Sequence, residues 1–235
     1  MVREAIILAG GFGTRLRAVV EDRPKALAPI NGRPFLEYLL DYLIRSGLER
    51  FVFSVGYRAR QIEEHFGASY RGYPIRYALE TEPLGTGGGI LNALPLTSEE
   101  TVLVTNGDSL FLADLAAQWK VHTESAAVAT LALRPMRDFS RYGRVELAAD
   151  GRVLAFREKE AVAEGLINGG VYLLRRDAFA LAELNGAFSL EKDFFGALVA
   201  TLPFYARPDA AYFLDIGIPE DFARAQADFK AFDPG

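Results

Sequence analysis

The first half of the chain alternates short apolar runs with amphipathic segments. The run over residues 5–9 contains no polar side chain and stops at two glycines, which is typical of a buried strand of a parallel sheet that ends in a loop. Apolar residues then recur at helical spacing from Pro34 to Gly47, which predicts a helix. Similar patterns predict further strands over 51–55, 75–79 and 101–105 and helices over 60–66 and 112–119. This alternation predicts a parallel sheet with helices on both faces.

The pattern changes after Val128. Two alternating stretches, over 144–147 and 153–156, flank Asp150-Gly151, and an Asp-Gly pair in this position is a hairpin signal. Later strands and the start of a final helix are predicted over 171–174, over 212–216 and at Pro219. The sequence therefore predicts an α/β protein, organised as a single domain over 1–235, whose mostly parallel sheet receives antiparallel strands late in the chain.

Composition and charge narrow the function classes. Lysine and arginine total 26 against 31 acidic residues, and the net charge of −5 provides no attraction to a polyphosphate chain, so we expect no nucleic-acid partner. The chain has no cysteine, which excludes disulfides, thiolate zinc sites and thiol nucleophiles and agrees with a cytoplasmic location. No apolar stretch approaches the roughly 18 residues of a membrane helix, so we expect no membrane partner.

A glycine-rich loop follows the first predicted strand. The segment Gly10-Gly11-Phe12-Gly13-Thr14-Arg15-Leu16 combines three glycines, a hydroxyl and a cation where backbone amides can face an anion. The dinucleotide-binding fingerprint requires glycine in place of Leu16, and the P-loop requires G-K-[ST], so neither motif matches. Lys25 follows the rigid Pro24 and adds a second cation for the same phosphates. A turn cluster with an incidental arginine, and a solvated surface lysine, are the alternatives.

Together these segments read G-G-x-G-T-R-L followed by P-K, and from about residue 4 to 229 the chain resembles the sugar-1-phosphate nucleotidyltransferases, or sugar-nucleotide pyrophosphorylases. The resemblance implies a Rossmann-like, glycosyltransferase-A-like fold with a nucleotide-binding part over about 1–123 and an antiparallel sugar-binding insertion within about 124–235. It implies catalytic roles for Arg15 and Lys25. It also implies a set of nucleotide-binding residues, namely Leu8, Ala9, Gly10, Gly11, Gly13, Thr14, Glu80, Pro83, Gly85, Thr86, Asn106 and Gly107.

Two aspartates follow the pattern of a metal site. Asp108, within Asn106-Gly107-Asp108, and Asp215, within Asp215-Ile216-Gly217, each stand at the carboxyl end of a predicted strand, the edge where open α/β sheets bind ligands. A pair of carboxylates there suits Mg²⁺, which prefers a few protein oxygens together with substrate phosphates. Either aspartate alone could simply cap a turn. The resemblance implies that Asp108 and Asp215 are catalytic and hold the magnesium cofactor.

Glu80 follows the third predicted strand, at the position that the resemblance places against the nucleobase. Relatives that use uridine or thymidine triphosphate commonly have glutamine there, because an amide both donates to and accepts from a pyrimidine. An ionised carboxylate only accepts hydrogen bonds. Guanine offers two adjacent donors and uracil one, so Glu80 favours GTP. The alternative is that Glu80 points to solvent and backbone groups bind the base.

The resemblance also implies a sugar side. Gly143, Glu158, Lys159, Asn168 and Gly169 match segments that hold the sugar and its phosphate, although Glu160 stands where many relatives have proline, so we expect a less rigid loop after Lys159. The segments 138–143, 166–170, 188–191 and 213–221 look most like the guanylyltransferases for D-glycero-α-D-manno-heptose 1-phosphate, which make GDP-heptose for bacterial surface polysaccharides.

The substrates implied are GTP and a sugar 1-phosphate, and a homodimer is compatible with the sequence. The second pKa of a phosphate monoester is about 6, so near neutral pH the acceptor needs no protein base. Close alternatives are a mannose 1-phosphate guanylyltransferase and an N-acetylmuramic acid 1-phosphate uridylyltransferase. From other classes, a non-catalytic sugar-nucleotide-binding regulatory subunit has no need of the full set Arg15, Lys25, Asp108 and Asp215, and Leu16 argues against a dehydrogenase.

Overall fold

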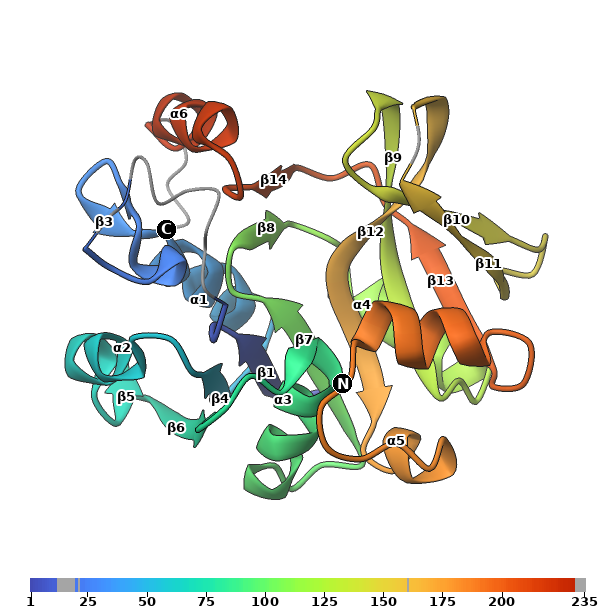
Figure 1. Ribbon diagram of the computed structural model, residues 1–235, viewed down its shortest axis with the longest axis horizontal. Helices are drawn as coiled ribbons and strands as arrows, with labels where there is room; N and C mark the ends of the chain where they lie inside the picture. Colours follow the sequence, from blue (N-terminus) through green and yellow to red (C-terminus); the bar gives the residue numbers. More distant parts are fainter. Residues whose placement is uncertain (12–19, 21, 160, 231–235) are drawn as a thin grey trace.

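The computed structural model describes residues 1–11, 20, 22–159 and 161–230 (Figure 1). Its main sheet begins at one edge with β11 (Val153–Lys159), β10 (Gly143–Leu147) and β12 (Val162–Arg175), and continues with β7, β1, β4, β6 and β5, whose bounds follow. The centre is parallel, as the sequence predicts, and consists of β7 (Thr101–Asn106), β1 (Glu4–Leu8), β4 (Arg50–Val55) and β6 (Tyr73–Leu79). The short β5 (Ser69–Tyr70) pairs with β6 in the antiparallel direction. The carboxyl ends of the central strands therefore lie along one edge of the sheet.

Antiparallel strands extend this sheet beyond β7. The long β12 (Val162–Arg175) pairs with β7, so the strands from both halves of the chain form one sheet. The predicted hairpin is present as β10 (Gly143–Leu147) and β11 (Val153–Lys159). Two strands that the sequence patterns did not predict complete the region, β9 (Ala129–Phe139), paired with β12, and β13 (Phe204–Pro208), paired with β9.

Helices cover both faces of the sheet, which confirms the predicted fold class. On one face α1 (Phe35–Arg45) and α2 (Ala59–Phe66) pack in the same core cluster as Ile7 of β1. On the other face, α3 (Gly85–Ala93) and a π-helix over Leu190–Gly196 share a core cluster with Ile6. The remaining helices are η1 (Lys25–Leu27), η2 (Leu94–Leu96), α4 (Leu115–Glu124), α5 (Ala178–Leu181) and α6 (Pro219–Asp228). None of the helices among the described residues combines the length and apolar character needed to cross a membrane.

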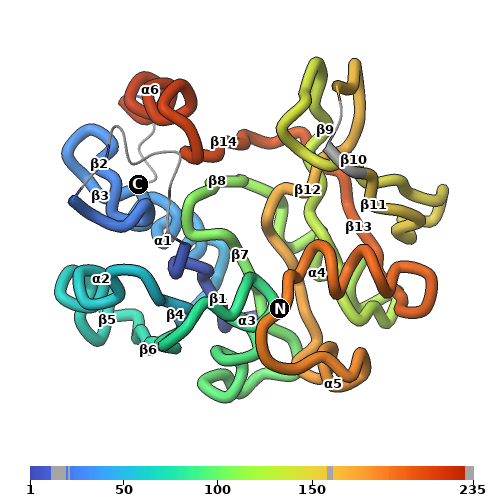
Figure 2. Tube along the Cα trace, viewed as in Figure 1, coloured from blue at the N-terminus to red at the C-terminus, as the bar shows by residue number. Residues whose placement is uncertain are grey.

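Two small ribbons lie beside the main sheet, toward the top of the view in Figure 2. The antiparallel pair β8 (Ser109–Phe111) and β14 (Phe213–Asp215) brings the end of the chain back to the carboxyl end of β7. The hairpin of β2 (Pro29–Ile30) and β3 (Arg33–Pro34) lies next to α6. The amide of Gln226 on α6 donates to the Pro29 carbonyl at 2.7 Å and accepts from the Asn31 N–H at 2.8 Å. This contact ties the segment after Lys25 to the helix that follows Asp215.

Helix α3 contains four glycines, which is unfavourable for a helix unless packing requires them. A Cβ atom on Gly85 would lie 2.6 Å from the Phe188 carbonyl oxygen, and one on Gly87 would lie 2.1 Å from the Phe188 ring. Gly85 also has a φ of +71°, a left-handed conformation that glycine adopts readily. The glycines therefore allow the segment 188–191 to lie directly against α3.

Candidate active site

A cavity of about 520 Å³ opens at the carboxyl edge of the parallel strands. It brings together ten residues predicted to bind the nucleotide, which are Leu8, Ala9, Gly10, Gly11, Glu80, Pro83, Gly85, Thr86, Asn106 and Gly107. Gly13, Thr14 and Arg15 lie outside the described residues. The cavity is also lined by Gly56 and Tyr57, which the sequence reasoning missed, although they directly follow a predicted strand. We name this space the large cavity.

Glu80 lies in the wall of the large cavity and is directed into the protein. Its Oε1 accepts a hydrogen bond from the Ser54 hydroxyl at 2.8 Å, and its Oε2 accepts from the Leu84 N–H at 3.3 Å. A Cβ atom on either Gly10 or Gly89 would lie 2.9 Å from Oε1, so glycine at both positions makes room for the carboxylate. The structure therefore contradicts the alternative in which Glu80 points to solvent. Each carboxylate oxygen keeps a further lone pair for a ligand.

Lys25 and Asp108 line the large cavity, and strand pairing brings Asp215, the second predicted metal ligand, close to Asp108. The ammonium of Lys25 donates to Asp108 Oδ2 at 2.6 Å. Asp108 immediately precedes β8, and Asp215 ends β14, where it stands opposite Ser109. The Ile216 N–H donates to the Asp108 carbonyl at 3.0 Å, which fixes the two chain segments to each other. Strand pairing thus brings together two aspartates that are far apart in the sequence.

The electrostatics of this pair suit a hard cation. Burial raises the pKa of Asp215, and the negative charge of Asp108 raises it further, while Lys25 and the Gly217 N–H act in the opposite direction. Two neighbouring negative carboxylates repel each other, and a divalent cation bound to both removes that repulsion and stabilises their charged forms. Among the described residues there is no cluster of three or more metal-binding side chains. An oxygen-only pair of this kind fits Mg²⁺, which completes its coordination with water and phosphate oxygens.

A second, smaller cavity of about 160 Å³ adjoins the first, and Asn106 lines both. It brings Asp215 together with three residues predicted to bind the sugar, Gly143, Asn168 and Gly169. Glu158 and Lys159 belong to β11, and the backbone of Lys159 pairs with Gly143, but their side chains lie outside the described part of the structure. We name this space the small cavity.

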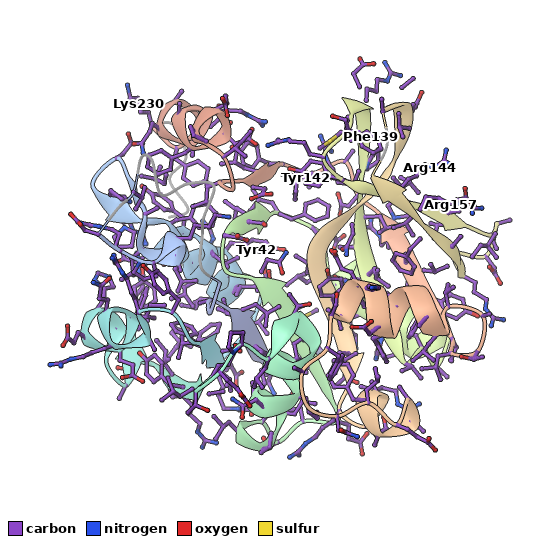
Figure 3. The ribbon with its side chains drawn as sticks, viewed as in Figure 1. Tyr42, Phe139, Tyr142, Arg144, Arg157 and Lys230 are labelled. Atoms are coloured by element: carbon purple, nitrogen blue, oxygen red, sulfur yellow. The ribbon has the colours of Figure 1, made fainter. Side chains whose placement is uncertain are left out.

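The small cavity contains further polar side chains that were not among the predicted site residues. Arg141 donates to Asp221 Oδ2 at 2.6 Å. Tyr142 lies between β8 and β12 in Figure 3, and its ring packs against Phe213 with 6.0 Å between centroids. Burial, with the charge of Asp215, raises the pKa of Tyr142 to about 12. The resemblance had placed Arg141 and Tyr142 in a segment that matches a sugar-binding segment of relatives, but of that segment only Gly143 was predicted as a site residue.

Asn168 forms the centre of the opposite wall of the small cavity. Its Nδ2 donates to the Tyr172 hydroxyl at 2.7 Å and to Glu191 Oε1 at 3.2 Å, and its Oδ1 accepts from the Gly170 N–H at 3.1 Å. These bonds orient the amide. Neither of the two histidines of the chain lines the large or the small cavity. The two cavities therefore present cations, carboxylates and amides, which suits the positioning of phosphates and hydroxyls.

Comparison with known proteins agrees with this geometry. Residues 4–231 match the model of a family described as nucleotidyl transferase. This chain belongs to the nucleotidyl transferase family. The D-glycero-α-D-manno-heptose 1-phosphate guanylyltransferase of Aneurinibacillus thermoaerophilus is 46% identical over 229 residues, which are 97% of this chain and 99% of that protein. The protein of the same description from Campylobacter jejuni is 42% identical, over 93% of this chain and 96% of its own length.

A solved structure supports the same assignment. HddC from Yersinia pseudotuberculosis, in a complex with GMP-PN, matches with a TM-score of 0.84 and 33% identity, over 97% of this chain and 100% of that one. The family and the fold class predicted from the glycine loop, Lys25 and the strand pattern are therefore confirmed. The chain is an enzyme of the sugar-1-phosphate nucleotidyltransferase class.

Proposed function

We propose that this enzyme joins GTP and D-glycero-α-D-manno-heptose 1-phosphate to form GDP-heptose and pyrophosphate. The observation that carries the proposal is the position of Lys25, Asp108 and Asp215 where the large and the small cavity meet. Two relatives with this description match almost the whole chain at 46% and 42% identity. GDP-heptose is a precursor of bacterial surface polysaccharides, and we assign the enzyme to their biosynthesis in the cytoplasm.

We assign the large cavity to GTP. The free lone pairs of the Glu80 carboxylate are suited to accept from the ring N–H and the amino group of guanine. The glycine loop amides, Lys25 and, from the sequence, Arg15 would hold the phosphates. We divide the chain at about residue 123, with the sugar held by the later part.

We assign the small cavity to the sugar phosphate. Asn168 and Glu158 would bind sugar hydroxyls, Gly143 and Gly169 would line the ring, and Lys159 would orient the phosphate. Asp108 and Asp215 would hold Mg²⁺, which when bound supplies positive charge for the phosphates of the nucleotide. Because the lysine ammonium already contacts Asp108, it lies where it can also bind a phosphate oxygen and orient it.

The reaction needs little proton transfer. A sugar-phosphate oxygen forms a bond to the α-phosphorus while the bond from that phosphorus to the pyrophosphate oxygen breaks in line, with no covalent enzyme intermediate. The attacking phosphate is already a dianion near neutral pH, so no protein base is required. Cations and amides around the phosphates perform the catalysis by positioning them and stabilising charge.

Pyrophosphate release tests the proposal. GTP, UTP, dTTP, CTP and ATP are crossed with heptose, mannose, glucose and N-acetylmuramic acid 1-phosphates in the presence of Mg²⁺. We expect release with GTP and the manno-heptose phosphate. Preference for mannose 1-phosphate, or release with UTP and N-acetylmuramic acid 1-phosphate, would replace the proposed substrates with those alternatives. Binding of a GDP-sugar without turnover of any pair would indicate a regulatory subunit instead.

A further inference from the structure

Glu191 places a negative charge in the small cavity for which the reaction itself has no use. Its Oε1 accepts from the Asn168 amide at 3.2 Å. No described residue donates a hydrogen bond to Oε2, and no described cation pairs with the carboxylate. The side chain lines the small cavity and is exposed to it. An ionised carboxylate with a free oxygen in a ligand cavity is an acceptor for hydroxyl groups.

The backbone that carries Glu191 is fixed in place. The Leu190 N–H donates to the Thr86 hydroxyl at 2.9 Å, and the Phe188 carbonyl accepts from the Gly87 N–H at 3.0 Å, so α3 holds both ends of the segment 188–190. The hydroxyl of Ser189 then accepts from the Lys192 N–H at 3.2 Å and caps the π-helix. Thr86 lines the large cavity, so Glu191 is anchored to the wall of the neighbouring site. A carboxylate held this way is positioned before the sugar arrives.

Charge sets the direction in which a sugar phosphate enters. The anionic phosphate is attracted to Lys25, Arg141 and a cation at Asp108 and Asp215, and it is repelled by Glu191. Glu191 reaches the small cavity from the π-helix, whereas Asp215 reaches it from β14, so the two carboxylates enter it from different elements. We therefore expect the hydroxyls remote from the phosphate to face Glu191.

We propose that Glu191 is a specificity-determining residue that accepts hydrogen bonds from the exocyclic hydroxyls of the heptose. This inference rests on the proposed function. D-glycero-D-manno-heptose has the ring of mannose, but its side chain carries neighbouring hydroxyls on C6 and C7, whereas mannose has a single exocyclic hydroxyl on C6. A carboxylate accepts two such hydroxyls at once. Glu191 thus selects the seven-carbon sugar over mannose.

The test compares the wild type with Glu191→Gln and Glu191→Asp. GTP is kept saturating, and kcat and KM are measured for the manno-heptose 1-phosphate and for mannose 1-phosphate. We expect Glu191→Gln to raise KM for the heptose phosphate about tenfold, the effect of one charge-assisted hydrogen bond, with kcat nearly unchanged. KM for mannose 1-phosphate changes by less than about threefold. The ratio of kcat/KM between the two sugars therefore falls several-fold, and Glu191→Asp, which keeps the charge, recovers part of it.

The matched control is Glu124→Gln, whose side chain is 65% exposed on α4 and pairs only with Lys120 among the described residues. We expect this control to leave kcat/KM for both sugar phosphates unchanged. If Glu191→Gln lowered kcat/KM equally for both sugar phosphates, Glu191 would contact the ring that the two sugars share. That result would overturn its role in specificity. If the wild type showed no activity with GTP and either sugar phosphate, the proposed function would fail. The role of Glu191 would then fail with it. If the wild type is active but Glu191→Gln has the same ratio of kcat/KM between the two sugars, only the role of Glu191 in specificity is overturned, and the proposed function stands.

Discussion

The ammonium of Lys25 lies 2.6 Å from the carboxylate of Asp108, a residue 83 positions later in the chain. The lysine side chain is 14% exposed and that of Asp108 is 35% exposed, so the pair is shielded from bulk water while it still borders the large cavity. A cation held here strengthens phosphate binding, because the effective dielectric is lower than at an open surface. In the proposed function, Lys25 would therefore link the nucleotide phosphates to the carboxylates that would hold the metal.

A variant without the Lys25 ammonium tests whether this side chain binds the nucleotide phosphates. We expect Lys25→Met to lower kcat/KM for GTP by about a hundredfold or more, which is the typical cost of losing one group that stabilises the reacting phosphates. Pyrophosphate release under steady-state conditions measures the effect. The control is Lys120→Met on α4, where the side chain is 74% exposed. A Lys25→Met enzyme with the kinetics of that control would remove Lys25 from the site.

The position of Glu80 predicts the nucleotide preference. In Glu80→Gln the amide oxygen can still accept from the Ser54 hydroxyl, now at 2.8 Å, and only the longer 3.3 Å bond from the Leu84 N–H loses its acceptor. The variant then presents a donor to the base, and we expect its preference for GTP over UTP and dTTP to fall about tenfold. The ratio of kcat/KM values for the three nucleotides measures this. An unchanged ratio would show that other groups bind the base.

Packing of Phe188 against α3 predicts a stability effect. In Gly87→Ala the new methyl group would lie 2.1 Å from the Phe188 ring, which is itself 7% exposed and cannot move freely. We expect this overpacking to cost about 1–3 kcal/mol and to lower Tm by about 3–10 °C. Gly11→Ala is the control, because no described atom lies within 4 Å of its added Cβ. Equal melting temperatures for the two variants would contradict the account of the glycine-rich helix.

Glu4 predicts how stability depends on pH. Burial alone would raise its pKa, but hydrogen bonds from the Ser98 N–H, Arg50 and the Glu99 N–H outweigh burial and lower the pKa from 4.5 to about 2. Because the folded state lowers the pKa, the contribution to the free energy of unfolding is complete above about pH 4.5 and is lost as the pH falls toward 2. That contribution is at most about 3 kcal/mol.

Denaturant unfolding of the wild type and Glu4→Gln between pH 7 and pH 2 measures this contribution. We expect Glu4→Gln to be the less stable protein at pH 7 and the difference to narrow as the pH approaches 2. Arg50 also pairs with Glu99, so its charge remains partly compensated in the variant. A difference that stays constant over the whole range would show that the ionisation of Glu4 does not contribute.

Local sequence patterns predicted the parts of this fold that local physics determines. The apolar run before Gly10 is β1, and the Asp150-Gly151 turn joins β10 to β11 as expected. The sequence could not show that β14 pairs with β8, because no local pattern encodes a contact between Ser109 and Asp215. The strand pattern placed both aspartates at one edge of the sheet, and the resemblance to known nucleotidyltransferases assigned them to one metal site.

Other features remained hidden for related reasons. The strand β9 begins with a buried, mostly apolar run interrupted only by Thr130, which periodicity cannot distinguish from a helix. Glu191 was noted within a matching segment, yet its place in the small cavity depends on the π-helix, which departs from ordinary helical spacing. The roles predicted for Arg15, Glu158 and Lys159 stay predictions, since Arg15 and the side chains of the other two lie outside the described residues.

The most direct test of the central claim is phosphorus NMR of GTP, the manno-heptose 1-phosphate and Mg²⁺ with the enzyme. We expect equal amounts of a GDP-sugar diphosphate signal and of free pyrophosphate with the wild type. With Asp215→Asn we expect a rate lower by about a hundredfold or more, because one of the two carboxylates for the metal is lost. Absence of the GDP-sugar signal with the wild type would contradict the proposed reaction, and undiminished formation of the GDP-sugar by Asp215→Asn would remove Asp215 from the metal site.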